Sequence, residues 1–82
     1  MLVPLYGFLK GDTLGVVLLV QHDDPVARIA SSIMEAAAPR VRPAARARVF
    51  FSGRELAETM TVSEAGLAAL DRVDVHPITE EG

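Results

Sequence analysis

The sequence predicts an α+β fold, in which a mixed sheet of four to five strands packs on one main helix plus a short helical turn. Three features carry this prediction: an apolar strand pair in the first 20 residues, one amphipathic helix, and alternating strands in the second half. The 82 residues fit a single domain spanning residues 1–82. Hydrophobic residues make up 50% and charged residues 23%, which is typical of a folded globular domain.

The first feature is the stretch from residue 2 to residue 20, which reads as strands Leu2–Leu9 and Leu14–Gln21 joined by a turn at Lys10–Thr13. Successive side chains of a strand point to opposite faces of the sheet, so Val17 and Leu19 share one face. The other face of that strand is formed by Leu14, Val16, Leu18 and Val20.

Both faces of this strand pair are therefore apolar, and a single helix can cover only one of them. The other face is left to water or to another protein, and a contiguous exposed apolar patch usually marks an interaction site. Val17 and Leu19 are accordingly our first candidates for partner binding.

The second feature is a helix that begins after Asp23-Asp24-Pro25 and ends near Ala38, before Pro39. We expect an aspartate side chain to cap the helix by accepting from first-turn N–H groups. This interpretation is favoured over a carboxylate pair for acid–base chemistry. The apolar positions follow helical spacing and are Val26, Ile29, Ala30, Ile33, Met34 and Ala37.

The second half of the chain contains shorter elements. In order, they are a loop at Pro39–Ala45, a strand at Arg46–Phe51, a short strand at Arg54–Leu56 and a last strand at Arg72–Ile78. Between the last two strands, Thr61 and Glu64 match the capping-box pattern, and Gly66 is placed to end a single helical turn. In the last strand, Val73 and Val75 are expected to point inward.

Composition excludes several classes of function. The net charge of −3 gives no general electrostatic reason to bind nucleic acid, and without cysteine there is no disulfide and no thiolate site. No apolar run approaches the ~20 residues that span a bilayer, and the chain does not begin with the basic segment of a signal peptide. We expect a cytoplasmic protein that does not bind membranes.

Two further groups are candidates for partner binding. Arg40, Arg42, Arg46 and Arg48 could meet an acidic partner surface or form a solvated loop, and both interpretations remain open. Phe50 is expected to point outward, where it could be an interface anchor or could pack under a neighbouring side chain.

No constellation of residues supports catalysis. His22 and His76 lack the spacing of a metal site, and the serines have no evident base. Gly7, Gly11 and Gly15 do not lead into a helix, so they form no phosphate-binding loop. We therefore expect no catalytic, cofactor-binding or metal-binding residues, and no enzyme activity of the chain on its own.

The order of elements, together with ARVFFSGRELAETMTVSEAGLAALDRVDV at Ala47–Val75, resembles the ubiquitin-like β-grasp fold. The shared features are an apolar strand ending in Phe51, a Ser-Gly turn, a short strand with Leu56, and the Thr-Val-Ser-Glu turn before the last strand. This resemblance implies that the strand carrying Val17 and Leu19 lies at a sheet edge, where an uncovered apolar strand is an aggregation hazard.

Within this fold, three segments resemble the system B protein family of toluene-4-monooxygenase. They are VPLYGFLKGDTLGVVLLV, the VRP segment at Val41–Pro43 and TVSEAGLAALDRVDV. The resemblance implies a non-catalytic γ subunit of a bacterial multicomponent monooxygenase for aromatic hydrocarbons. Such a subunit would dock on a large hydroxylase α subunit that carries the diiron centre, and would hold no cofactor itself.

Other roles of the ubiquitin-like fold fit less well. The chain ends Thr79-Glu80-Glu81-Gly82 and not in Gly-Gly, so we expect no covalent conjugation. At the positions of the ubiquitin recognition patch stand Phe50, Asp74 and His76, of which only Phe50 is apolar. The alternative function is a ubiquitin-like adaptor of another bacterial assembly, such as type VII secretion.

Overall fold

The computed structural model describes residues 1–12, 14–38 and 46–78. Five strands form one sheet and a single α-helix packs on it. The elements are β1 (Leu2–Leu9), β2 (Gly15–Gln21), α1 (Val26–Ala37), β3 (Arg46–Phe51), β4 (Arg54–Leu56) and β5 (Arg72–Ile78). Every expected strand and the helix are therefore present, and the second strand begins one residue later than the sequence predicts.

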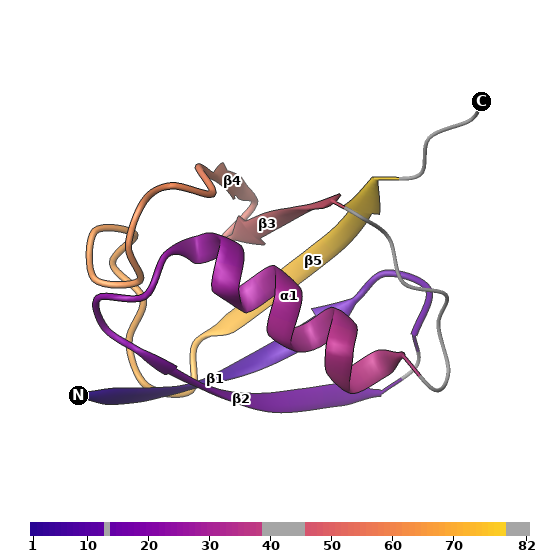
Figure 1. The fold of residues 1–82 in the computed structure, drawn as a ribbon, viewed down its shortest axis with the longest axis horizontal. Helices are drawn as coiled ribbons and strands as arrows, with labels where there is room; N and C mark the ends of the chain where they lie inside the picture. The colour runs from indigo at the N-terminus through magenta and orange to yellow at the C-terminus, as the bar shows by residue number, and fades with distance from the viewer. Residues whose placement is uncertain (13, 39–45, 79–82) are drawn as a thin grey trace.

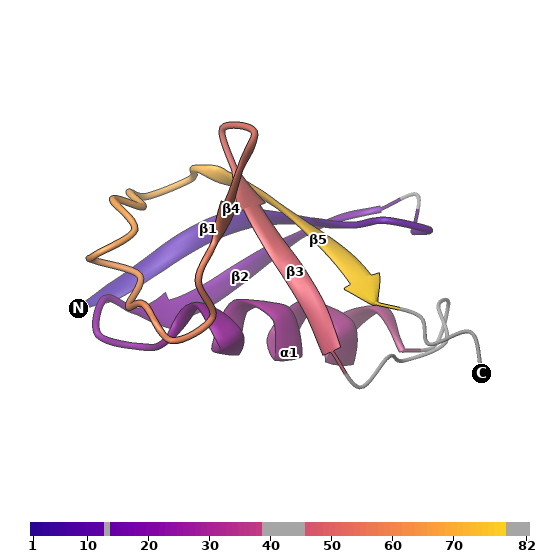
Figure 2. The same cartoon turned by 90° about the horizontal axis from the view of Figure 1, so that it is seen from above.

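The strand order β2-β1-β5-β3-β4 makes a mixed sheet. β1 runs parallel to β5, whereas β1–β2, β3–β4 and β3–β5 are antiparallel. Helix α1 lies across one face of this sheet, and the described residues place no helix on the other face (Figures 1 and 2). β2 is an edge strand, as expected, and β4 is the other edge.

The hydrophobic core lies between α1 and the inner face of the sheet. The helix buries one stripe along its length, formed by Val26, Ile29, Ala30, Ile33 and Ala37. The strands meet this stripe with their inward residues, and Leu5, Val20, Val49, Val73 and Val75 are at most 2% exposed. The alternation predicted for the last strand is confirmed. The stripe predicted for the helix is confirmed at five positions, and Met34, its sixth member, is only partly buried against the core.

The start of α1 differs from the sequence prediction. Pro25 is the N-cap residue and no side chain caps the helix. Asp24 instead accepts a hydrogen bond from the backbone N–H of Gln21 (2.8 Å), which closes the turn after β2. The N–H groups of Val26 and Ala27 donate to the carbonyls of Met60 (2.8 Å) and Glu58 (3.1 Å). A loop distant in sequence thus accepts the hydrogen bonds from the first N–H groups of α1, which were predicted to bind an aspartate side chain.

That loop is held by the predicted capping box. Glu64 N–H donates to Thr61 Oγ1 (3.0 Å), and Thr61 N–H donates to Glu64 Oε1 (2.9 Å). Gly66 follows with a positive φ of 76°, which glycine adopts without strain. The structure has hydrogen-bonded turns in this segment and no regular helix. These turns occupy the place where the sequence predicts a short helical turn.

Gly7 of β1 packs tightly under Ile33 of α1, and this contact gives a testable prediction. A Cβ atom at Gly7 would lie 2.7 Å from Ile33 Cδ1 and 3.0 Å from Leu18 Cδ1. Gly7→Ala should therefore lower the free energy of unfolding by about 1–3 kcal/mol through overpacking. Ile33→Val removes the Cδ1 methyl and should cost about 0.5–1.5 kcal/mol by itself.

The double variant should lose less stability than the two single losses combined, because the deleted methyl makes room for the added one. Urea denaturation of the four proteins measures this coupling. Simple additivity would show that the contact between residues 7 and 33 is not tight.

Candidate docking surface

The strand pair β1–β2 presents apolar side chains on the sheet face that α1 leaves open. Val17 is 55% exposed and Leu19 is 65% exposed, whereas Leu18 and Val20 are 5% and 2% exposed. The face assignment predicted for this strand is therefore confirmed. Leu14, which was placed on the inner face, precedes β2 and is exposed instead.

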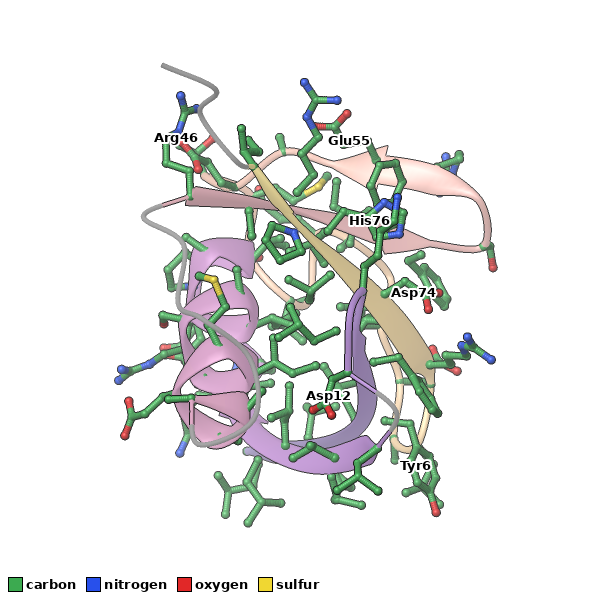
Figure 3. The ribbon with its side chains drawn as sticks, turned by 90° about the vertical axis from the view of Figure 1, so that its right-hand side faces the viewer. Tyr6, Asp12, Arg46, Glu55, Asp74 and His76 are labelled. Atoms are coloured by element: carbon green, nitrogen blue, oxygen red, sulfur yellow. The ribbon has the colours of Figure 1, made fainter. Side chains whose placement is uncertain are left out.

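The register between the two strands extends this surface onto β1. Tyr6 lies opposite Val17, and Pro4 lies opposite Leu19. Tyr6 is 44% exposed and projects from the sheet on the side away from α1 (Figure 3). Tyr6 is not among the residues predicted for partner binding, although alternation in Leu2–Leu9 places it on the outer face.

Exposed large apolar side chains are concentrated on β1 and β2 and the residues that flank them. Among the described residues they are Met1, Leu2, Tyr6, Leu14, Val17, Leu19 and Leu70. All but Leu70 belong to the N-terminal strand pair or its flanks. We call the group formed by Leu2, Pro4, Tyr6, Val17 and Leu19 the hairpin patch. None of its members is charged, which favours contact with an apolar protein surface.

The neighbouring half of the open sheet face carries the polar side chains of β5, and Arg72 and Asp74 are paired there. Arg72 donates to Asp74 Oδ1 at 3.0 Å and lies over the ring of Phe8, with its Cζ 4.2 Å from the ring centroid. Asp74 and His76 project to the same side as Tyr6 (Figure 3). The charges of Arg72 and Asp74 are therefore paired within the chain, whereas the hairpin patch is apolar.

Phe50 belongs to this polar half. Its ring packs on the imidazole of His76, with 4.6 Å between the ring centroids, and it is only partly exposed. Of the two interpretations left open by the sequence, the structure shows packing with a neighbouring side chain. A role of Phe50 in partner binding stays a prediction.

The four candidate arginines do not form one described cluster. Arg40 and Arg42 lie outside the described residues. Arg48 is 3.9 Å from a carboxylate oxygen of Glu55 in an exposed pair, which contributes little stability. Arg46 is exposed and begins β3, at the end of that strand far from Tyr6 (Figure 3). Binding of an acidic partner by these arginines remains a prediction.

The two edges of the sheet differ in their protection. β4 has three residues, two of them charged, which limits pairing with another strand. β2 has seven residues, GVVLLVQ, with no charge, no proline and an unbroken register to β1. Among the described residues β2 pairs with β1 alone. The unprotected edge thus adjoins the hairpin patch, and a partner would cover both.

A groove of about 460 Å³ between α1 and β3–β4 contains Ser31, but no histidine lines it. No group of three or more His, Cys, Asp or Glu residues in the described segments could hold a metal ion. No helix in these segments is long and apolar enough to span a bilayer.

Comparison with known proteins identifies the family. The family model of toluene-4-monooxygenase system protein B matches residues 2–76, which is nearly the whole chain. The chain belongs to this family. The match includes the hairpin patch and both edge strands, so the surface described above lies within the system protein B domain. A search of curated protein sequences gave no match.

Solved structures confirm the ubiquitin-like β-grasp fold of this chain. A chain of a toluene 4-monooxygenase HD complex with the inhibitor 4-bromobenzoate has a TM-score of 0.82 at 24% identity, covering 95% of this chain and 100% of that one. Caldiarchaeum subterraneum ubiquitin has a TM-score of 0.77 at 20% identity, with 100% of both chains covered. A ubiquitin-like domain from Arabidopsis thaliana has a TM-score of 0.75 at 16% identity, covering 99% of this chain and 82% of that one.

Proposed function

We propose that the chain is a non-catalytic γ subunit of a bacterial multicomponent monooxygenase for aromatic hydrocarbons of the toluene type. In this role it docks on the hydroxylase α subunit in the cytoplasm. The diiron centre belongs to the α subunit, and this chain supplies no ligand to it. Membership of the system protein B family supports the proposal, as does the likeness to a chain of a toluene 4-monooxygenase complex.

The observation that carries the docking role is the hairpin patch. Val17 and Leu19 expose more than half of their surface at the unprotected edge of the sheet. Burying such side chains is favourable by about 25 cal/mol per Å² of apolar area, so a partner that covers the patch gains affinity.

Affinity capture with the native chain tests this function. We expect it to recover a large iron-containing polypeptide that oxidises an aromatic hydrocarbon when its redox partners are added. Mass spectrometry and iron analysis identify the polypeptide. Capture of a membrane-associated secretion component instead would contradict the proposal and would favour the adaptor alternative.

A control variant with added charges away from the hairpin patch is used as a second bait. The variant Ala57→Asp/Thr59→Asp adds two negative charges at exposed positions after β4. It should recover the same hydroxylase polypeptide as the native chain, because these positions follow β4, which is the sheet edge opposite β2 and the hairpin patch.

A further inference from the structure

Leu70 is the only exposed large apolar side chain among the described residues that does not come from the N-terminal strand pair or its flanks. It lies in the segment between the capping-box turn and β5, and its side chain is 59% exposed. The fold nevertheless brings it to β1, because its N–H group donates to the carbonyl oxygen of Pro4 (2.6 Å). Leu70 therefore adjoins the hairpin patch at the N-terminal half of β1.

The backbone at Leu70 has a φ of 66°, in the left-handed region that favours glycine. A leucine there is held against a steric cost between its Cβ atom and the following carbonyl oxygen. Packing does not explain the choice, since more than half of the side chain is in water. Leucine is thus unfavourable at position 70 in two ways, because its backbone angle favours glycine and its apolar side chain is exposed to water.

Strained residues that the surrounding structure holds in place are characteristic of functional sites. We propose that Leu70 is a contact residue of the docking surface, which it extends from the hairpin patch across the N-terminal half of β1 to the segment before β5. The occupant is an apolar, uncharged area of the hydroxylase α subunit, so this inference rests on the proposed function.

Charge supports this choice of occupant. The extended surface contains Leu2, Pro4, Tyr6, Val17, Leu19 and Leu70 and has no charged member. Arg72 and Asp74, on the open face of β5, neutralise each other at 3.0 Å. The carboxylate of Asp71, next to Leu70, accepts a hydrogen bond from the N–H of Ala68 at 2.8 Å. A partner surface with a central charge would lose its hydration here without gaining a counter-charge.

The test separates docking from folding by relieving the strain. Leu70→Gly removes the side chain and leaves a residue that accepts a φ of 66°. We expect its melting temperature to equal or exceed that of the native chain, while its affinity for the captured hydroxylase falls about ten- to hundredfold. Leu70→Met keeps an apolar side chain and should bind within about threefold of the native chain.

Ser52 provides the matched control, since it is exposed, has a φ of 52° and lies in the turn between β3 and β4. Ser52→Gly relieves the same kind of strain away from the surface, and it should leave the affinity unchanged. Native affinity of Leu70→Gly would overturn the inference, and so would a loss of melting temperature in that variant. If the native chain itself does not bind the hydroxylase, the proposed function fails as well.

Discussion

Val17→Asp/Leu19→Asp should abolish binding to the hydroxylase while leaving the free domain folded. Both side chains are mostly exposed, at 55% and 65%, so replacing them removes little packing from the free protein. In a complex, two carboxylates would be taken from water into an apolar contact with no counter-charge, which is strongly unfavourable. Affinity should fall at least about a thousandfold, as expected when central contacts are lost.

Calorimetric titration of the hydroxylase checks the affinity, and circular dichroism with thermal melting checks the fold. The double variant Ala57→Asp/Thr59→Asp carries the same added charge and should bind like the native chain. Unfolding of the Val17→Asp/Leu19→Asp protein would show that these side chains belong to a core. Binding at native strength would show that the partner uses another surface.

The largest effect on stability is expected at Ile29, in the centre of the buried stripe of α1. Its side chain is 0% exposed. Ile29→Ala removes buried methyl and methylene groups and leaves a cavity, which costs about 2–5 kcal/mol. Total stability should be about 4–12 kcal/mol for a domain of 82 residues, so this one change removes much of it.

The melting temperature of Ile29→Ala should fall by at least about 10 °C, measured by circular dichroism. Ser31→Ala on the exposed side of the same helix is the control and should change stability by less than about 0.5 kcal/mol. A small loss at Ile29 would mean that α1 does not anchor the sheet.

Most of the fold could be predicted from the sequence because its signals are periodic. Alternation in β2 and β5 and helical spacing in α1 placed their buried residues on the correct faces. The capping box was predictable because Thr61 and Glu64 act within one turn. The prediction that an aspartate caps α1 was wrong. The first N–H groups of the helix donate instead to the carbonyls of Met60 and Glu58, more than 30 residues away.

The docking surface could be predicted only in part. Val17 and Leu19 follow from strand alternation, which fixes the face of each residue. Leu70 could not be found in this way, since it lies outside any periodic element and reaches β1 through a contact formed only in the folded chain. Its positive φ likewise has no local signal, because leucine is not a residue that favours this conformation.

Tyr6 reports most directly whether the hydroxylase covers the hairpin patch. Tyr6 is the only tyrosine of the chain and is 44% exposed within the patch. Hydroxyl-radical footprinting with peptide mass spectrometry compares its oxidation in the free chain and in the complex, with Met34 on α1 as the internal control. If the hydroxylase covers the patch, Tyr6 is strongly protected in the complex and the oxidation of Met34 is unchanged. Equal oxidation of Tyr6 in the free and bound chain would contradict this prediction.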